Sequence, residues 1–411
     1  METYQYLIVG GGLAGALAAA NLRKVDAEGS LLLITAEPHL PYSRPPLSKA
    51  YLQGKKERQK VFYKSETFYR ENDIEVAQGV MATGLDPDGR TVTLDDGRRL
   101  QYDKLLLATG GSARRLPLPG SDLEHVFTLR TLEDSDHIRE ASGRGRRAVV
   151  MGGSFIGAEV SMSLAELGTR VTLIFPESRL MERIMPPAMS DYLRDMYTAH
   201  GVHLLPGTVA ERLEGDGKLE RVVLDNGQTL EADLCVMGVG IELNTDLARQ
   251  AGLDLNDEGA VLVDEYLRTG DPNIYAAGDI AAWNDLTFQR RLRVEHWDVA
   301  RNTGARAGRN MAGEEEPYTE LPYFFSDMFD LSLEVWGNLD RWDETVKRGS
   351  LDEGSFAFYY FDEGQLTGVL AVERPDDERA PMQDLVRQRP MATDVAAALA
   401  DPAVNLDSLL D

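Results

Sequence analysis

Apolar and polar residues follow one another in short blocks along this chain, and the blocks predict strands joined by helices. The first block predicts a strand over 5–10, a helix over 13–24 and a second strand over 30–35. In this block, a short apolar run, typical of a buried strand, precedes a stretch of small and apolar residues at helical spacing. The same order restarts in the segment RRAVVMGGSFIGAEVSMSL. Repeated strand–helix–strand units are typical of a parallel sheet covered by helices.

Stretches rich in β-forming residues separate and follow these units. Strands around an Asp-Gly turn are predicted for IEVAQGVMATGLDP and RTVTLDDGRRLQY, and a hairpin followed by a buried strand for VVLDNGQTLEADLCVMGVG. The segment EPHLPYSRPPLSKAYL is interrupted by prolines and then predicts a helix from Leu47 onward. After about Leu321, LSLEVWGNL and SFAFYYFDEGQLTGVLAVE alternate apolar with polar residues, which predicts an antiparallel sheet. Short terminal helices are predicted for DVAAALADP and NLDSLLD.

The order of these blocks indicates an inserted domain. The stretch LPLPG is typical of a hinge, and RTGDPNIYAAGDIAAW returns to the pattern of the first domain. We therefore predict an α/β protein with two Rossmann-like nucleotide-binding domains, the second inserted in the first, and an α+β C-terminal domain with an antiparallel sheet. The predicted ranges are 1–113 with 243–320 for the first domain, 114–242 for the second and 321–411 for the third.

Two glycine-rich turns carry the chemistry of this prediction. Each follows an apolar strand and opens a helix, the first with Gly10, Gly12 and Gly15, the second with Gly152, Gly153 and Gly157. In such turns the glycines allow a tight bend, the approach of a pyrophosphate and close packing of helix on strand, and an acid about 20 residues on binds ribose hydroxyls. One copy is weak evidence, because glycines also ease packing, but two copies predict two dinucleotide sites. The candidate ribose acids are Glu37 and Glu177.

Composition narrows the class of protein. The chain has 411 residues, 43% of them hydrophobic and 27% charged, and a net charge of −25, which argues against nucleic acid and anionic membranes as partners. The chain has one cysteine, Cys235, which lies in an apolar run. With one cysteine no disulfide can form within the chain. The six histidines show no zinc-like spacing. The chain opens without a basic leader and holds no membrane-length apolar run, so we expect a cytoplasmic protein without a metal site.

The motifs in their order resemble those of the FAD-dependent NAD(P)H reductases of ferredoxin and rubredoxin, which share a fold with apoptosis-inducing factor. The resemblance rests on LIVGGGLAG, EPHLPYSRPPLSK, LLLATGG, TLRTLED, VVMGGSFIGAE, IYAAGD, RVEHWDVA and FFSDMFD. It implies that the first domain binds FAD, the second binds NAD, and the third forms an interface. Glutathione-reductase-like relatives, which need a cysteine pair, are excluded because the chain has one cysteine, and peroxidase-like relatives are excluded because the segment after Glu37 has none.

The resemblance also implies residues of the FAD site. The first turn would bind the pyrophosphate, Glu37 the adenosine ribose and Val80 the adenine, while Asp279 would contact the ribityl or pyrophosphate region. A helix cap at Asp279 and an ordinary core role for Trp297 are the simpler alternatives. His39 and His296 fit hydrogen-bonding scaffold better than proton carriers. The implied FAD residues are Gly10, Gly12, Ala14, Gly15, Glu37, Arg44, Lys49, Val80, Ala108, Thr109, Gly110, Arg130, Asp279, Glu295, His296 and Trp297.

In the same family a lysine and a glutamate meet beside the flavin, at positions that match Lys49 and Glu159. A cation there would favour the anionic reduced flavin, which is the role we hypothesise for Lys49. The alternative for Glu159 is a carboxylate favoured by the helix dipole, because it falls in the first turn of its predicted helix. The catalytic candidates are Lys49, Glu159 and Trp297. The NAD candidates are Gly153, Phe155, Ile156, Glu159, Glu177, Gly238, Val239 and Gly240.

Some positions depart from the family pattern. Phe175 stands where an acid is commoner and Ser154 where glycine is commonest, and Phe175-Pro176-Glu177 looks more like the apoptosis-inducing-factor branch. Leu243 replaces a usual proline, and Phe325 stands where tryptophan is frequent. These departures leave NADP open beside NAD, with Arg179 as a candidate for binding a 2′-phosphate.

The predicted activity is transfer of a hydride from NADH to FAD, followed by release of single electrons to a ferredoxin- or rubredoxin-type carrier. A chain of net charge −25 would repel an acidic carrier at long range, so docking would need a local basic patch. Two alternatives stay open: an NADH-sensing flavoprotein like apoptosis-inducing factor, and an oxidase that passes electrons to oxygen or quinone. A monomer and a homodimer are equally compatible. The candidate docking residues, for which surface ion pairs are an equal alternative, are Arg44, Arg290, Arg291, Arg293, Arg301, Arg306 and Arg309.

Overall fold

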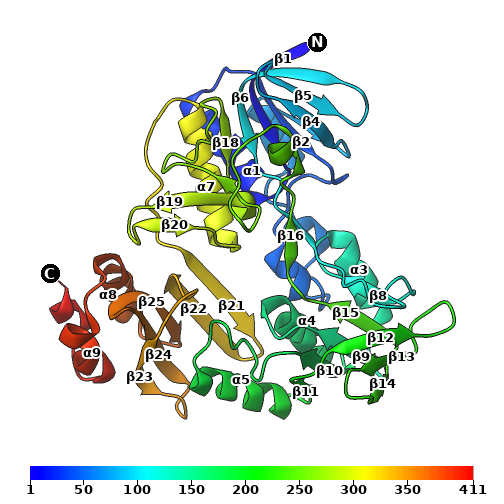
Figure 1. Ribbon diagram of the computed structural model, residues 1–411, viewed down its shortest axis with the longest axis vertical. Coiled ribbons are helices and arrows are strands. Elements are labelled where there is room, and N and C mark those ends of the chain that lie inside the picture. Colours follow the sequence, from blue (N-terminus) through cyan, green and yellow to red (C-terminus); the bar gives the residue numbers. More distant parts are fainter. Residues whose placement is uncertain (411) are drawn as a thin grey trace. The chain divides into compact units, whose positions relative to one another are not determined.

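The computed structural model describes residues 1–410, which form two compact units (Figure 1). Unit 1 comprises Met1–Ser43, Arg58–Ser112 and Glu242–Pro322. Unit 2 comprises Arg44–Glu57, Ala113–Ile241 and the chain from Tyr323 onward. The chain thus leaves unit 1 and later returns to it, which confirms the predicted insertion of one nucleotide-binding fold in another.

Unit 1 is built on a seven-stranded sheet. Its parallel part has the order β3-β2-β1-β6, and β18 pairs with the second half of β6, while the β4–β5 hairpin extends the sheet from the first half of β6. Strand β2 is buried along its whole length, and all its residues except the final threonine are apolar, as expected of a parallel strand covered on both faces. The strands are β1 (Glu2–Val9), β2 (Leu31–Thr35), β3 (Ile74–Gln78), β4 (Ala82–Asp86), β5 (Thr91–Leu94), β6 (Arg99–Leu107) and β18 (Ile274–Ala276).

Two helices of unit 1 pack closely against each other because one of them carries glycines at the contact. Helix α1 (Leu13–Val25) follows the first glycine turn, and α7 (Trp297–Met311) crosses it. A Cβ at Gly304 or Gly308 of α7 would lie 2.2 Å from a backbone oxygen of α1. The remaining elements of unit 1 are η2 (Arg58–Val61), α2 (Glu66–Glu71), α6 (Asp246–Gln250), β17 (Val261–Leu262), η3 (Gly278–Ile280), β19 (Ala281–Asp285) and β20 (Arg290–Leu292).

The central part of unit 2 repeats the design of unit 1. A five-stranded parallel sheet has the order β11-β10-β9-β15-β8, and a small antiparallel sheet, β12-β13-β14, follows β11 in the chain. Strands β7 (Gly111–Ala113) and β16 (Ile241–Leu243) pair where the chain passes between the units. The elements are β8 (Val126–Thr128), α3 (Leu132–Ala141), β9 (Arg147–Met151), α4 (Phe155–Glu166), β10 (Arg170–Phe175), α5 (Pro187–Ala199), β11 (His203–Pro206), β12 (Ala210–Glu214), β13 (Arg221–Leu224), β14 (Thr229–Glu231) and β15 (Leu234–Met237).

The C-terminal part of unit 2 confirms the predicted antiparallel sheet. Its strand order is β21-β22-β25-β24-β23, and the alternating stretches of the sequence form β22, β24 and β25. Asp411, the last residue of the predicted terminal helix, lies outside the described residues. The elements are β21 (Tyr323–Met328), β22 (Leu331–Gly337), β23 (Glu344–Ser350), β24 (Ser355–Asp362), β25 (Gln365–Val372), α8 (Asp376–Gln388), α9 (Ala392–Ala400) and η4 (Leu406–Leu409).

The helix predicted from Leu47 onward is wrong. The structure has only a short 3₁₀ helix, η1 (Pro45–Ser48), which ends at Lys49 with φ −126° and ψ −117°. Two carbonyls of this segment accept hydrogen bonds from other elements instead of continuing a helix. Ser135 of α3 donates to the carbonyl of Leu47 at 2.8 Å, and Ser163 of α4 donates to that of Ser48 at 2.6 Å. Tertiary hydrogen bonds therefore override the local helical preference.

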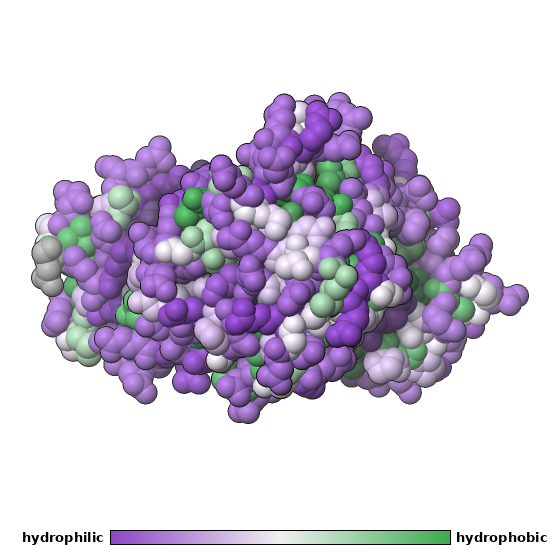
Figure 2. All heavy atoms as spheres, turned by 90° about the horizontal axis from the view of Figure 1, so that it is seen from above, coloured by the Kyte–Doolittle hydropathy of each residue, from purple (hydrophilic) through white to green (hydrophobic). Residues whose placement is uncertain are grey.

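The surface agrees with the charged composition. The face shown in Figure 2 is mostly hydrophilic, and its apolar atoms are scattered rather than gathered in one broad patch. Among residues 1–410, none of the helices combines the length and the apolar character needed to cross a membrane.

Candidate functional site

The first glycine turn joins β1 to α1, and its glycines have different reasons to be there. Gly10 has φ +124°, and a Cβ on it would lie 2.1 Å from the carbonyl oxygen of Ala108. A Cβ on Gly15 would lie 2.0 Å from the carbonyl oxygen of Gly10. Gly12 has an ordinary φ of −75°, and a Cβ on it would meet no atom within 4 Å. The packing of the protein requires glycine at positions 10 and 15, whereas Gly12 leaves open space for a ligand to approach the backbone.

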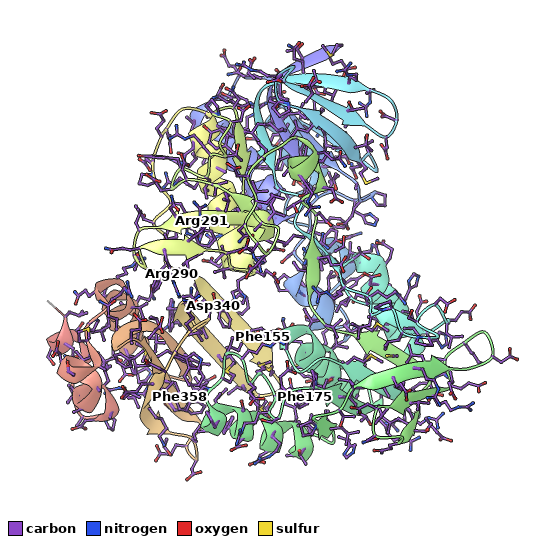
Figure 3. The ribbon with its side chains drawn as sticks, viewed as in Figure 1. Phe155, Phe175, Arg290, Arg291, Asp340 and Phe358 are labelled. Carbon is purple, nitrogen blue, oxygen red and sulfur yellow. The ribbon has the colours of Figure 1, made fainter. Side chains whose placement is uncertain are left out.

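The second turn, between β9 and α4, repeats this geometry. Gly152 has φ +111°, and a Cβ on it would lie 2.2 Å from the carbonyl oxygen of Gly238. A Cβ on Gly157 would lie 1.8 Å from the carbonyl oxygen of Gly152. Gly153 faces the ring of Phe175, which a Cβ would approach to 2.7 Å. The aromatic ring that stands in place of the commoner acid is thus packed against the turn, at the end of β10 (Figure 3).

Both turns present the start of a helix without a side-chain cap. The N-cap residues are Gly12 for α1 and Ser154 for α4, and neither side chain accepts a hydrogen bond from its helix. No acidic residue lies in the first turn of either helix. The first N–H groups of a helix need partners, and they favour anions because of the helix dipole. Both turns therefore fit a pyrophosphate.

Glu37 and Glu177 occupy the same place in the two folds. Each follows the second strand of its sheet, and its carbonyl oxygen accepts a hydrogen bond from a glycine: Gly79 N at 3.0 Å for Glu37, and Gly207 N at 2.9 Å for Glu177. Their carboxylates differ in partner. The hydroxyl of Tyr42 donates to Glu37, whereas Glu177 pairs with the exposed Arg183 at 3.1 Å. The ribose acids predicted from spacing therefore have equivalent backbone positions.

A pocket of about 410 Å³ opens beside Glu37 on unit 1. It is lined by residues from the loop after β2, from the segment that leads into α2 and from the end of β3. Val80, the predicted adenine contact, follows this lining, and its N–H donates to the carbonyl of Thr35 at 3.1 Å. The lining residues are Pro38, His39, Leu40, Gln59, Phe62, Tyr63, Lys64, Ser65, Glu66 and Gln78.

The loop after β6 is held by a residue from far along the chain. The hydroxyl of Thr109 donates to the backbone carbonyl of Asn244 at 2.5 Å, and the side-chain amide of Asn244 donates to the carbonyl of Thr109 at 3.1 Å. The N–H of Asn244 donates to the carbonyl of Gly110 at 2.9 Å. These bonds fix the predicted cofactor loop Ala108–Gly110 within unit 1.

Glu159 lies at the centre of a buried polar cluster in unit 2. Its carboxylate pairs with the ammonium of Lys49 at 2.8 Å, and the side chains are 7% and 14% exposed respectively. Ser48 donates to the same oxygen, Oε2, and Ser326 donates to Oε1 at 2.7 Å. Burial and the charge of Glu159 raise the pKa of the buried Tyr197 well above its usual value. The structure brings Lys49 and Glu159 together, as the resemblance implied.

One expectation about Glu159 needs correction. We expected this residue in the first turn of its helix, where the dipole would favour a carboxylate. Helix α4 begins at Phe155, so Glu159 falls in the second turn, and the first turn holds no acid. The helix dipole weakens beyond the first turn. The ion pair with Lys49 and the two serine hydroxyls therefore explain the buried carboxylate better.

The predicted flavin neighbours at 295–297 lie where α7 begins. His296 is the N-cap residue, Trp297 is the first helical residue, and the guanidinium of Arg301 lies 5.9 Å from the Trp297 ring. Burial lowers the pKa of His296 to about 4, and the charge of Asp279 opposes that shift. Asp279 itself lies in η3, directly after β18. A neutral His296 agrees with a scaffold role and not with a proton carrier.

The candidate residues divide between the two units. Unit 1 holds the first turn, Glu37, Val80, the loop at 108–110, Asp279 and the residues 295–297. Unit 2 holds Arg44, Lys49, Arg130 and the whole predicted NAD set. Within unit 2, the guanidinium of Arg44 donates to the backbone carbonyl of Arg130. Ser48 and Ser326 were missed, because a single serine carries no pattern, although FFSDMFD includes Ser326.

Most arginines of the predicted docking patch have partners within the protein. Arg291 donates to the carbonyls of Val263 and Ala282, at 3.0 and 2.7 Å, and so serves the fold of unit 1 (Figure 3). The other paired arginines are Arg293 with Glu258 and Glu295, Arg301 with Asp298, Arg306 with Glu316, and Arg309 with Glu314. Surface ion pairs, the alternative interpretation, describe these arginines better than a free basic patch does.

Comparisons with known proteins agree with this geometry. Residues 4–304 match the family model described as pyridine nucleotide-disulphide oxidoreductase, and residues 323–410 match the model described as reductase C-terminal. The chain is 34% identical to a probable ferredoxin reductase of Castellaniella defragrans, over 98% of each chain. It is 33% identical to the ferredoxin–NAD(+) reductase component of an anthranilate 1,2-dioxygenase system of Burkholderia cepacia, over 100% of each chain.

Solved structures extend the agreement to the fold. The chain is similar to a covalent putidaredoxin reductase–putidaredoxin complex, with a TM-score of 0.93 and 31% identity over 99% of this chain and 98% of the other. Two nucleotide-binding folds in one chain, with a single buried cysteine, define a class of oxidoreductase that works without a redox disulfide.

The chain belongs to the pyridine nucleotide-disulphide oxidoreductase family, among its ferredoxin reductases. It is an FAD-dependent oxidoreductase, and the family and the names of the relatives imply FAD and NAD(H) as cofactors.

Proposed function

We propose that residues 1–113 and 243–320 bind FAD, that residues 114–242 bind the nicotinamide nucleotide, and that the enzyme passes electrons from NADH to a ferredoxin- or rubredoxin-type carrier. The observation that carries this proposal is the duplicated glycine turn. In both copies two glycines are required by the backbone of the protein and the following helix has no cap, and in the first copy Gly12 faces open space. In this assignment, residues 1–113 and 243–320 form the FAD-binding domain and residues 321–411 an interface domain.

We propose for FAD the residues that the family resemblance implies, and the geometry of the first turn supports this assignment. The backbone at Gly10, Gly12, Ala14 and Gly15 binds the pyrophosphate, and Glu37 binds the adenosine ribose. The pocket beside Glu37 takes the adenine, with Val80 at its edge. The other proposed FAD contacts are Arg44, Lys49, Ala108, Thr109, Gly110, Arg130, Asp279, Glu295, His296 and Trp297.

Bound FAD supplies the step between a two-electron donor and a one-electron carrier. The protein supplies orientation and charge. Glu159 holds the ammonium of Lys49 in a buried cluster at 2.8 Å, so that a cation is fixed in place rather than free to rotate in water. We propose that Lys49 supplies the cation that stabilises reduced flavin. We propose that Trp297 packs against the flavin ring. The NAD contacts are Gly153, Phe155, Ile156, Glu159, Glu177, Gly238 and Gly240.

For the nicotinamide nucleotide, we propose NADH as the preferred donor over NADPH. A carboxylate in the place of Glu177 binds the two ribose hydroxyls and repels a 2′-phosphate. Arg183 pairs with that carboxylate, and Arg179, the candidate for phosphate binding, lies 3.8 Å from Asp191. Both arginines therefore have acidic partners with which a 2′-phosphate would compete.

Docking of the carrier must depend on short-range contacts, because the overall charge of the chain does not attract an acidic protein. The net charge of −25 opposes long-range attraction of an acidic carrier, and the arginines described above are largely neutralised. Contact between matching surfaces at short range, rather than long-range steering, is the arrangement that this charge distribution favours.

A rapid-mixing experiment tests the proposed function. The FAD-loaded enzyme is reduced with NADH and then mixed separately with a ferredoxin, a rubredoxin, oxygen and a quinone. We expect fast reoxidation by one of the iron–sulfur carriers and slow reoxidation by oxygen and quinone. Fast reaction with oxygen or quinone would identify an oxidase. Slow reaction with every acceptor would identify a sensor, and either result would contradict the proposal.

A further inference from the structure

Helix α4 carries two sets of contacts that meet at Glu159. On one side, Phe155 packs edge-to-face with Phe324 at 5.2 Å, and Met162 Sδ accepts a hydrogen bond from the N–H of Phe329 at 2.9 Å. Phe155, Glu159 and Met162 are spaced at i, i+4 and i+7, so they share one face of the helix. That face contacts β21 and the turn that follows it.

The neighbouring face of α4 contacts the segment 44–57. Ser163 accepts a hydrogen bond from the amide of Gln53 at 3.0 Å and donates to the carbonyl of Ser48 at 2.6 Å. Glu166 pairs with Lys55 at 2.6 Å. Glu159, Ser163 and Glu166 are again spaced at i, i+4 and i+7. Glu159 is therefore the residue that belongs to both faces.

The two oxygens of Glu159 are shared between these two segments. Oε2 faces Ser48 and Lys49, and Oε1 accepts its hydrogen bond from Ser326 at 2.7 Å. As whole residues, Glu159 is 5% exposed and Ser326 is 1% exposed, so water does not readily replace the serine hydroxyl. The nearby hydroxyl of Tyr197 is buried and makes no hydrogen bond among the described residues. Ser326 is thus the donor that satisfies Oε1.

We propose that Ser326 is a positioning residue for the redox site: through Glu159 it fixes the orientation of the Lys49 ammonium. This inference rests on the proposed role of Lys49 beside the flavin. A buried carboxylate oxygen that loses its donor is strongly destabilised. The carboxylate then relieves that loss by rotating and drawing both oxygens toward Lys49, its remaining charged partner. The cation becomes more fully neutralised and less able to stabilise an additional negative charge nearby.

The test measures the midpoint potential of the bound flavin in the FAD-loaded enzyme, together with flavin content and melting temperature. We expect Ser326→Ala to lower the potential, with about a tenfold loss in the stability of the reduced form relative to the oxidised form, which is about 30 mV for a two-electron couple. Lys49→Met should lower it further. The double variant should match Lys49→Met alone, because Ser326 acts through Lys49.

A matched control separates this effect from a general effect on the C-terminal sheet. Ser332 lies on the adjacent strand, and its hydroxyl donates to the exposed Asp327 at 2.9 Å, so Ser332→Ala should leave the potential unchanged. If Ser326→Ala does not hold FAD, Ser326→Cys takes its place, because a thiol has a similar shape but is a weak donor.

Two outcomes distinguish failure of this inference from failure of the proposed function. If Lys49→Met lowers the potential and Ser326→Ala or Ser326→Cys does not, the positioning role is wrong while the role of Lys49 stands. If Lys49→Met leaves the potential unchanged, the proposed role of Lys49 fails, and the inference fails with it.

Discussion

The ammonium of Lys49 lies 2.8 Å from the carboxylate of Glu159, and both side chains are largely buried. Lys49 ends the 3₁₀ helix of the proline-rich segment, and Glu159 lies on α4 of the inserted domain. An ion pair in such a place is weak evidence for stability, because both charges lose water. Removing one partner has a large effect, because the other is left buried without compensation.

We therefore expect Glu159→Ala to lower the free energy of unfolding by about 3 kcal/mol. This substitution leaves the largely buried Lys49 ammonium without its anionic partner and two serine hydroxyls without their acceptor. Denaturant titration of the variant and the natural chain measures the difference. Glu166→Ala is the matched control, because Glu166 also sits on α4 and pairs with a lysine, but its pair is more exposed. That change should cost less than about 1 kcal/mol, and equal losses for the two variants would contradict the burial argument.

The glycines of the first turn should separate folding from cofactor binding. Gly12→Ala places its Cβ in open space at an ordinary φ, so we expect the apo protein to keep its melting temperature and to lose FAD affinity. Gly15→Ala places its Cβ 2.0 Å from a carbonyl oxygen and should destabilise the protein by more than about 2 kcal/mol. Flavin fluorescence titration and thermal unfolding measure the two quantities. Unchanged FAD affinity in Gly12→Ala would show that the turn does not approach the pyrophosphate.

The nucleotide preference should depend on Glu177. Loss of a charged hydrogen bond to the ribose costs about 1.5–3 kcal/mol, so Glu177→Ala should raise the Kd for NADH at least tenfold. The same change removes the partner of Arg183 and should improve binding of NADPH. Titration calorimetry with ADP-ribose and its 2′-phosphate measures binding without turnover. Arg179→Ala is the companion variant, and equal losses for both nucleotides in Glu177→Ala would rule out a role in selection.

The stability of the protein at acid pH should depend on His296. Burial lowers its folded-state pKa to about 4, below the ordinary value of 6.5. Between these values the unfolded chain binds a proton that the folded chain does not, so this group stabilises the fold above pH 6.5 and the contribution falls away as pH drops toward 4. Because the burial of His296 is incomplete, we expect a difference of only about 2 kcal/mol between pH 7.5 and 4.5. His296→Asn should reduce that difference, and an unchanged pH profile would contradict the burial of the ring.

Cys235 should be inert in the folded protein. It lies buried in β15, and burial raises the pKa of its thiol to about 12. A thiol-specific reagent at pH 8 should therefore modify no cysteine in the native chain and one in denaturant. Rapid modification of the native protein would mean that β15 opens readily.

Much of the fold followed from sequence because its signals are local. The strand–turn–helix at Gly10 and the one at Gly152 each place an apolar run, a positive-φ glycine and a helix within a few residues. The β-branched and aromatic residues of β24 and β25 likewise indicate strands, although both strands are buried along nearly their whole length rather than on one face only. The positions of Glu37 and Glu177 also follow from the chain itself, because each lies two residues beyond the second strand of its fold.

The features that could not be predicted depend on distant partners. The segment after Leu47 did not become a helix, because Ser135 and Ser163 capture its carbonyls from other helices. Nothing local marks Ser326 as a partner of Glu159 either. The arginines at 291–309 looked like a basic patch along the chain, and their acids and carbonyls became visible only in three dimensions.

The two oxygens of the Glu159 carboxylate contact two distant segments of the chain, and this has a practical consequence for work on fragments of this enzyme. A shortened protein that stops before Tyr323 would retain the glutamate and lose the hydroxyl that solvates one of its oxygens. One buried carboxylate oxygen of residues 114–242 thus depends on a hydroxyl from the C-terminal part of the chain. Fragments excised along apparent domain borders should therefore be less stable than the intact chain.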